Sequence, residues 1–305
     1  MLQYGLKIIP TFTMGGSMTD QDITSSQYCL IVPGENNQPK VVLTGGGARA
    51  EIYLHGAHLT SWIPAGGVER LFLSRSSDFG PDASIRGGVP IIFPQFAQRG
   101  PLLSHGFARR SDWEIMRAEE RESSALAVFQ LHDSAATRAL WPHAFLAEMA
   151  VTVGGQSLEL SLTIRNTGSE AFSFTSALHT YLRIQDIHSA AIVGLQGLRY
   201  FDTFTDQAEH TEQNSALSFE GETDRIYYQV PGALGLQEPA RQLRVEQRGV
   251  PDVVTWNPWS LRGAALADLE PDGYLHMLCI EAALIHEPLN LEPGESWNGV
   301  QSLTA

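Results

Sequence analysis

The chain has 305 residues, a formal net charge of −14 at pH 7, and ordinary proportions of hydrophobic (43%) and charged (18%) residues. This length suits one large domain or two ordinary ones, and the hydrophobic content allows a substantial core. The negative charge repels nucleic acids and anionic membrane surfaces, so we expect neither as a partner. An anionic small molecule could still bind, but only at a local cluster of cationic side chains.

The N-terminal residues lack the charge and apolar organisation of a signal peptide. We interpret residues 1–22 as a flexible segment or a leader, and residues 23–305 as a single domain. Cys29 and Cys279 are too few for a disulfide framework, so we expect buried free thiols in a reducing, cytoplasmic compartment. No apolar run approaches the length of a membrane span.

From residue 41 onward, hydrophobic residues recur with a period of two, which is typical of strands. The clearest case is the alternating run 145–153, followed by Gly154-Gly155 and a second alternating run, 158–164. Two alternating runs joined by a two-residue turn predict a β-hairpin. Further strands are predicted at residues 41–43, 50–54, 125–131, 172–182, 226–230, 243–246, 253–256 and 275–280.

Turn residues separate these runs throughout, and no linker, fixed repeat or change of composition divides the chain. Helical periodicity is sparse, so we expect helices to be short and peripheral. Many strands without a composition break favour one large antiparallel sandwich or barrel. Gly45-Gly46-Gly47 lies between strand residues with no helix after it, so we interpret it as a hairpin turn and not as a phosphate loop.

Two arginines stand out among glycines, prolines and phenylalanines: Arg86 in the segment Ile85–Pro90, and Arg109 in His105–Arg109. A guanidinium group binds phosphate or carboxylate through two parallel hydrogen bonds. Gly87-Gly88 would also let the backbone approach a ligand closely. The pattern is consistent with a pocket for a small anion, and structural arginines at the base of a loop are an equally weighted alternative.

His179 falls within the predicted strand 172–182. Strict alternation places it on the face of Ser173, Thr175 and Ala177, which suggests the wall of a polar cavity. A histidine hydrogen-bonded within the core is the alternative.

Glu281 ends the apolar run 275–280, where partial burial would raise its pKa and suit a proton acceptor near neutral pH. A strand-end carboxylate that reaches solvent or pairs with an arginine is the alternative. His55 and His58 are close enough in sequence to chelate a metal ion, but no third ligand stands at a suitable spacing, so we expect no metal site there.

Taken together, these segments resemble the glucose-6-phosphate 1-epimerase (D-hexose-6-phosphate mutarotase) family of the aldose 1-epimerase superfamily. The matching segments follow the family's order from about residue 40 to the C-terminus: Gly56–Trp62, Ile85–Pro90, Phe93–Phe96, His105–Arg109, Ala177–Tyr181, Thr223–Tyr227, Val254–Trp259, Cys279–Ala282 and Leu291–Glu295. Ser104 departs from the pattern, because many relatives have glutamine there, and this puts that contact in doubt.

The resemblance implies an all-β fold, a β-supersandwich of the galactose-mutarotase type with its site on a concave face. It also assigns residues by position. His179 and Glu281 match the catalytic pair, and the substrate-binding positions are matched by Arg86, His105, Arg109 and Asp224, with Asp202 as a rival to Asp224.

The implied activity is interconversion of the α and β anomers of a hexose 6-phosphate, with D-glucose 6-phosphate expected as substrate. Glu281 would act as the base and protonated His179 as the acid, without a metal or an organic cofactor. One alternative is an aldose 1-epimerase of free sugars, which the arginine pair opposes. The other is a non-catalytic carbohydrate-binding protein, which retention of both His179 and Glu281 opposes. We expect a monomer, with dimerisation through an exposed edge strand as the alternative.

Overall fold

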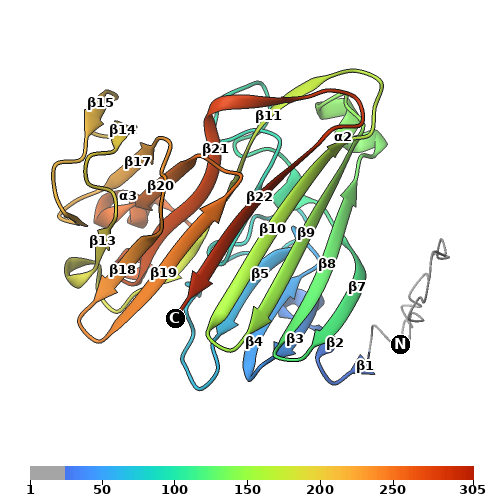
Figure 1. The fold of residues 1–305 in the computed structure, drawn as a ribbon, viewed down its shortest axis with the longest axis horizontal. Coiled ribbons are helices and arrows are strands. Elements are labelled where there is room, and N and C mark those ends of the chain that lie inside the picture. Colours follow the sequence, from blue (N-terminus) through green and yellow to red (C-terminus); the bar gives the residue numbers. More distant parts are fainter. Residues whose placement is uncertain (1–24) are drawn as a thin grey trace.

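The computed structural model describes residues 25–305, so the predicted flexible segment 1–22 lies outside the described residues (Figure 1). The described chain forms three antiparallel sheets. The five-stranded sheet comes first in sequence and has its strands in chain order: β1 (Ser25–Ser26), β2 (Cys29–Pro33), β3 (Pro39–Gly45), β4 (Ala48–Tyr53) and β5 (His58–Ile63).

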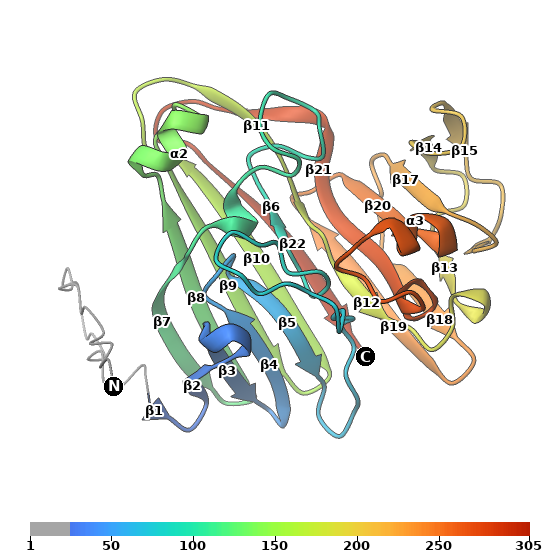
Figure 2. The same cartoon turned by 180° about the vertical axis from the view of Figure 1, so that it is seen from behind.

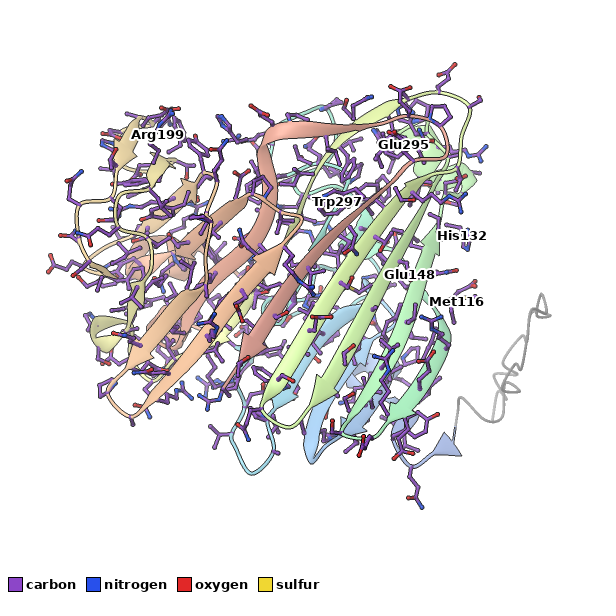
Figure 3. All side chains as sticks on the ribbon, in the orientation of Figure 1. Met116, His132, Glu148, Arg199, Glu295 and Trp297 are labelled. Carbon is purple, nitrogen blue, oxygen red and sulfur yellow. The ribbon has the colours of Figure 1, made fainter. Side chains whose placement is uncertain are left out.

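The nine-stranded sheet forms one broad layer in the order β16 (Ala216–Ser218), β13 (Ala191–Val193), β18 (Leu234–Glu238), β19 (Arg241–Arg248), β22 (Ser296–Thr304), β10 (Ser157–Asn166), β9 (Phe145–Gly154), β8 (Ser124–His132) and β7 (Glu114–Arg121). Its outward face carries side chains that include Met116, His132 and Glu148 (Figure 3). C-terminal strand β22 lies at its centre, between β19 and β10, so the end of the chain joins the two halves of this layer.

The eight-stranded sheet carries the residues of interest and has the order β15 (Glu209–Thr211), β14 (Arg199–Asp202), β17 (Thr223–Tyr227), β20 (Asp252–Asn257), β21 (Met277–Leu291), β11 (Phe172–Leu178) and β6 (Ile91–Ile92), with β12 (Tyr181–Arg183) also paired to β21. The five- and eight-stranded sheets lie side by side behind the nine-stranded layer (Figures 1 and 2).

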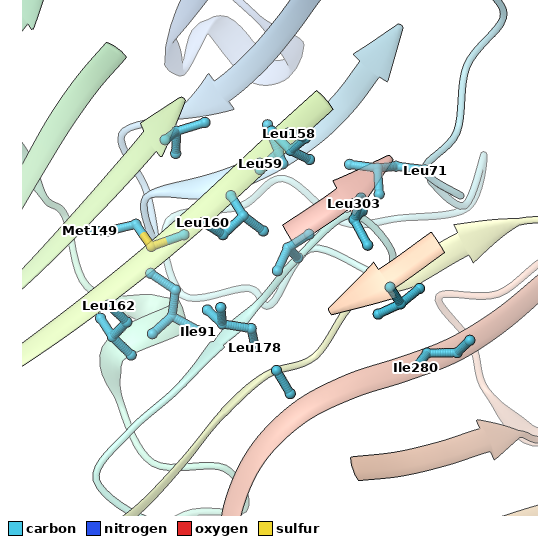
Figure 4. Packing of buried hydrophobic residues seen from close by; sticks show 14 of the residues in the cluster. Leu59, Leu71, Ile91, Met149, Leu158, Leu160, Leu162, Leu178, Ile280 and Leu303 are labelled. Carbon is cyan, nitrogen blue, oxygen red and sulfur yellow. The ribbon is translucent and has the colours of Figure 1, made fainter. Parts of the chain in front are cut away.

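Apolar residues from all three sheets meet in one continuous core (Figure 4). Leu59 of β5, Leu160 of β10 and Ile280 of β21 are each fully or almost fully buried in it. The period-two pattern explains this packing, because alternate side chains of a strand point to opposite faces of its sheet. In β9, for example, buried and partly exposed residues alternate along nearly the whole strand.

Most sequence predictions of secondary structure are confirmed. The hairpin at Gly154-Gly155 joins β9 to β10, and Gly45–Gly47 forms the turn between β3 and β4. The two α-helices of the described chain, α2 (Ala135–Leu140) and α3 (Trp259–Ala265), are short and lie at the periphery. Within the described residues, no helix has the length and apolar character needed to cross a bilayer.

Three predicted strands differ in detail. The run predicted at 226–230 is shifted, because β17 spans Thr223–Tyr227. Residues 172–182 do not form one strand, because β11 ends at Leu178 and β12 begins at Tyr181. The run 275–280 begins as a 3-10 helix, Gly273–His276, and its strand residues open the 15-residue β21. Hydrophobic periodicity finds strands but does not locate such breaks, which depend on backbone contacts with other segments.

Candidate active site

His179 lies at the break between β11 and β12, directly opposite Glu281 of β21. The last three residues of β11, Ser176–Leu178, and all of β12 pair with β21 in one register, in which Tyr181 lies opposite Cys279. The same register therefore brings His179 opposite Glu281. A hydrogen bond from the Ile280 amide to the Thr180 carbonyl (3.1 Å) joins the two segments at this point. Two residues a hundred positions apart thus face each other through strand pairing alone.

The segment that contains Arg86 runs along the other side of His179. The His179 amide donates to the Pro90 carbonyl (3.0 Å), and the Tyr181 amide donates to the Gly88 carbonyl (2.9 Å). The segments around Arg86, His179 and Glu281, all singled out in the sequence, therefore lie next to one another at one point of the sheet.

Side chains from neighbouring strands form two rows that run across the strands on one face of the eight-stranded sheet. Paired residues of neighbouring strands point to the same face, so each row can be read from the register. The first row holds Ile226, Val254, Glu281 and His179, and the second holds Asp224, Trp256, Cys279 and Tyr181. The rows give the site an apolar floor crossed by a few ionisable groups.

His179 and Glu281 are in direct contact, with 3.3 Å between His179 Nε2 and Glu281 Oε1. Both are buried, at 8% and 1% exposure. Burial lowers the pKa of His179 well below its usual value, and His105, Arg109 and Arg86 lower it further. Burial also raises the pKa of Glu281 well above its usual value, with Asp224 adding to the shift. Each group is thus driven toward its neutral form.

The neutral pair and the ion pair differ only by one proton transfer across this contact. In either form, one member can donate a proton while the other accepts one. Glu281 Oε2 and His179 Nδ1 have no protein hydrogen-bond partner. Because an unpaired buried polar atom is costly, these atoms indicate groups retained for chemistry rather than for stability.

The ring of His179 is held by other rings. It stacks on Tyr181 at 4.8 Å between centroids, and its edges meet Trp256 at 6.0 Å and His105 at 5.6 Å. The prediction that His179 shares one sheet face with Ser173 and Ala177 is partly wrong. Ala177 belongs to the same apolar cluster as Tyr181 and Trp256, but Ser173 is exposed. A register shift between Phe174 and Ser176 interrupts the alternation on which that prediction rested.

His105 is brought to the site by an unusual backbone conformation, with φ of 68°. Its Nδ1 accepts a hydrogen bond from the Ala97 amide (3.3 Å), which leaves Nε2 as the N–H donor. Burial lowers the pKa of His105 to about 3, and Arg109 and Arg86 contribute. His105 is therefore a neutral hydrogen-bond donor beside the His179 ring.

Arg86 is held on two sides in the site. Its Nη1 donates to the Tyr181 hydroxyl (2.9 Å) and its Nη2 to the Asp268 carboxylate (3.0 Å). Tyr181 and Asp268 also raise the pKa of Arg86, against the effect of burial. Its Nε has no partner. Asp268 was not among the residues predicted from sequence, because nothing in the sequence around it signals its position beside Arg86.

Arg109 lies in the short 3-10 helix Ala108–Arg110, and its Nη2 donates to the Ser104 carbonyl (3.1 Å). Ser104 thus contacts Arg109 through its backbone, a contact that does not depend on the side chain at this position. Burial lowers the pKa of Arg109 to about 10, and neighbouring Arg110 and Arg86 add to that effect. Neighbouring positive charges that are only partly neutralised by carboxylates attract an anion.

A cavity of about 480 Å³ opens at these arginines. That volume is within the range of small-molecule sites. Its lining brings together three guanidinium groups and two carboxylates: Arg86, Arg109, Arg110, Asp78 and Asp268. Pro90 and Tyr181 also line it, whereas His179 and Glu281 are not part of this lining. The two predicted arginines therefore line one cavity together with Tyr181, whose ring stacks on that of His179.

Asp224 lies at the far end of the second row, beyond Trp256. Burial raises its pKa, and Arg262 Nη1 lies 3.8 Å from its Oδ2. Its rival Asp202 instead accepts hydrogen bonds from the amides of Phe204 (3.1 Å) and Thr205 (2.7 Å). The Asp202 carboxylate is thus occupied in holding a turn, which favours Asp224 as the carboxylate available to a ligand.

The imidazole rings of His55 and His58 both form hydrogen bonds with other groups of the protein. His55 contacts Asp112 (2.9 Å) and the Ala83 carbonyl (3.0 Å), and His58 Nε2 donates to the Gly87 carbonyl (2.7 Å). The His58 contact supports the segment that follows Arg86. These two histidines therefore support the segment that carries Arg86, which together with Arg109 forms what we call the arginine wall.

Gln301 of β22 links the two catalytic candidates from behind. It accepts a hydrogen bond from the Thr180 hydroxyl and donates from Nε2 to the Ile280 carbonyl (2.9 Å). Thr180 follows His179 and Ile280 precedes Glu281, so one fully buried amide contacts the side chain of one neighbour and the backbone of the other. No motif in the sequence points to Gln301, which lies in the C-terminal strand β22.

Comparison with known proteins shows similarity to one enzyme family over most of the chain. Residues 39–304 match the family described as aldose 1-epimerase. A provisionally named glucose-6-phosphate 1-epimerase of Cenchrus ciliaris is 38% identical over 292 residues, covering 92% of this chain and 88% of that protein. One of Escherichia coli K12, named in the same way, is 35% identical over 246 residues, covering 78% and 81%.

Solved structures agree with the fold. The crystal structure of a provisionally named mutarotase from Salmonella typhimurium has a TM-score of 0.86 at 29% identity, covering 92% of this chain and 94% of that one. A galactose mutarotase related enzyme from Lactobacillus acidophilus has a TM-score of 0.69 at 16% identity, covering 87% and 96%, and shows the fold alone. The fold is thus the predicted all-β supersandwich of the galactose-mutarotase type, and the chain belongs to the aldose 1-epimerase family of enzymes.

Proposed function

We propose that this protein interconverts the α and β anomers of a hexose 6-phosphate, with D-glucose 6-phosphate as the preferred substrate. The observation that carries the proposal is the position of an anion-attracting wall, Arg86 and Arg109, beside a buried acid–base pair, His179 and Glu281. Homologues that carry the name glucose-6-phosphate 1-epimerase support the same substrate.

Anomerisation requires that a proton leave the C1 hydroxyl while another reaches the ring oxygen, so that the C1–O5 bond breaks. Both oxygens are bonded to C1, so two groups 3.3 Å apart can address one oxygen each. Transfer of the Glu281 proton to His179 first converts the neutral pair into the ion pair. Glu281 then takes the hydroxyl proton, and His179 delivers its proton to O5. Rotation about C1–C2 presents the other face of the aldehyde, and the exchange of roles closes the ring as the other anomer.

The remaining predicted residues position the sugar. His105, a neutral donor at Nε2, hydrogen-bonds near the ring oxygen, and Asp224 accepts hydrogen bonds from sugar hydroxyls. Arg86 and Arg109 bind the 6-phosphate, and binding energy far from C1 helps to orient the reacting carbon. These steps use no metal ion or organic cofactor. We also propose that residues 23–305 act as one domain and that the protein works as a monomer.

The test measures mutarotation of glucose 6-phosphate, glucose and galactose by the wild-type protein and by Arg86→Ala. We expect a preference for the phosphorylated sugar that Arg86→Ala reduces by about tenfold to a hundredfold, since a charge-assisted hydrogen bond contributes about 1.5–3 kcal/mol. Arg75→Ala is the matched control, because Arg75 is exposed and lies outside the cavity lining. Equal rates on phosphorylated and free sugars would favour a free-sugar epimerase, and binding without turnover would favour a carbohydrate-binding protein.

A further inference from the structure

Cys279 lies in the site but has no part in the reaction proposed above. It precedes Glu281 by two positions on β21, so both side chains point to the same face of the sheet. The ligand atoms offered by His179, Cys279 and Glu281 all lie within 4.8 Å of one another, and all three residues are buried. Among residues 25–305, this is the one group of three or more such side chains with metal-ligand spacing.

The spacing within this group fits a tetrahedral metal ion. A zinc ion bonded to imidazole nitrogen and carboxylate oxygen at ordinary lengths separates those two atoms by about 3.4 Å. His179 Nε2 and Glu281 Oε1 are 3.3 Å apart, without any adjustment. The Cys279 sulfur lies within 4.8 Å of both atoms, and bonding to the same tetrahedral zinc ion requires a separation of about 3.5 Å. Side-chain rotation therefore has to close at most about 1.3 Å.

The chemistry of the three groups also suits a thiophilic cation. Imidazole, thiolate and carboxylate are the usual zinc ligands, and three protein ligands leave the fourth position open. Glu281 is buried and its Oε2 has no hydrogen-bond partner, so the carboxylate is not engaged by protein groups that would hold it away from an ion. Arg86 and Arg109 act on the same groups and oppose a cation, so we expect affinity below that of a structural zinc site.

We propose that His179, Cys279 and Glu281 form a binding site for a thiophilic divalent cation of the Zn²⁺ class, and that an ion bound there inhibits the enzyme. The ion occupies His179 Nε2 and Glu281 Oε1, the atoms that carry protons in the proposed reaction. Inhibition is therefore competitive with the sugar and is reversed by a chelator. The binding part of this proposal holds for any substrate, so it can fail or succeed independently of the function proposed above.

The test follows Co²⁺ binding to the intact protein by absorption, since cobalt bound to a thiolate has a charge-transfer band in the near ultraviolet, and Zn²⁺ binding by competition with a chelating dye. Wild type should show the band and lose it when Zn²⁺ is added. Cys279→Ser should lose the band and bind Zn²⁺ at least about tenfold more weakly, because one of three ligands is replaced by a poor one. Cys29→Ser, a change at the other buried cysteine, is the matched control and should behave as wild type.

Activity supplies a second measurement. Zn²⁺ inhibition is expressed relative to each variant's own rate without Zn²⁺. On this scale Cys279→Ser should become resistant to Zn²⁺, whereas Cys29→Ser should stay sensitive. If serine at 279 prevents folding, Cys279→Ala gives the same comparison with a small apolar side chain. Equal Zn²⁺ affinities of wild type and the Cys279 variants would overturn the proposal, as would a cobalt band that persists without Cys279 or Zn²⁺ inhibition that does not depend on Cys279.

Discussion

The acid–base pair and the arginine wall are neighbours, but the protein builds them in different ways. His179 and Glu281 are set by the register of paired strands in the middle of a sheet. Arg86 and Arg109 stand on irregular segments between β5 and β7, held by backbone contacts and by side chains such as His58. Strand pairing fixes the chemical step in a rigid frame, while loops can vary the part of the substrate that is recognised.

The largest expected effect is on the mutarotation rate and concerns the pair His179 and Glu281. Glu281→Gln keeps the shape of the side chain but removes the proton acceptor, so we expect mutarotation to fall by about 10²–10⁴-fold. Binding of inorganic phosphate at the arginine wall, measured by calorimetry, should stay within about twofold of wild type if the two regions are separable. A variant with the wild-type rate would remove Glu281 from the chemistry.

The next effect tests the backbone of the arginine wall. Gly88 has φ of 59°, and a Cβ there would lie 2.2 Å from the Leu59 carbonyl oxygen. We expect Gly88→Ala to lower the free energy of unfolding by about 2–4 kcal/mol, measured in urea, because strain and a steric clash add. Gly155→Ala is the matched control: its φ is 54° but nothing lies within 4 Å, so only about 1 kcal/mol is expected. Equal losses would show that Gly88 has no packing constraint.

A third effect concerns pH and His58, which supports that wall. Burial lowers the pKa of His58 to about 4, so the unfolded chain, with a histidine pKa near 6.5, binds the proton more readily. The stability that His58 contributes is therefore complete above about pH 6.5 and is lost as pH falls toward 4, by about 1.4 kcal/mol per pH unit.

The raised pKa values of Glu281 and Asp224 act in the opposite direction, because their folded forms hold protons more tightly. The comparison of wild type with His58→Gln cancels these shared contributions. Urea unfolding at pH 7 and pH 5 should show a smaller loss on acidification in the variant. The same loss in both proteins would mean that His58 does not carry this sensitivity.

The smallest effect sharpens the role of Asp268. Its carboxylate pairs with Arg86 and so competes with an incoming anion for the same guanidinium group. Asp268→Asn should bind inorganic phosphate about threefold to tenfold more tightly, since a partly exposed ion pair is worth about 1 kcal/mol. Asp272→Asn removes the same charge from the same loop, away from the cavity lining, and should have little effect. Weaker binding in Asp268→Asn would mean that Asp268 orients Arg86 for the anion.

Much of the fold is readable from the sequence, because burial of one strand face imposes a period of two on the residues themselves. The run 145–153 shows this pattern in full and becomes a strand with alternating burial. The break at His179 is not readable in this way, since it depends on hydrogen bonds to Pro90 and Gly88 of a distant segment. Local pattern therefore identified the strands, and contacts between segments decided where they stop.

The sequence by itself determined the residue types of the site: two arginines among glycines, a histidine and a glutamate in strands, and an ordered set of segments shared with one family. Only the tertiary structure decided that His179 lies 3.3 Å from Glu281 and that Asp268 pairs with Arg86. The same holds for Gln301, which forms hydrogen bonds with the residues next to His179 and Glu281. The physical reason is the pairing of strands from distant parts of the chain. A one-residue change of register would turn every side chain of a strand to the other face, and no local pattern specifies the partner strand.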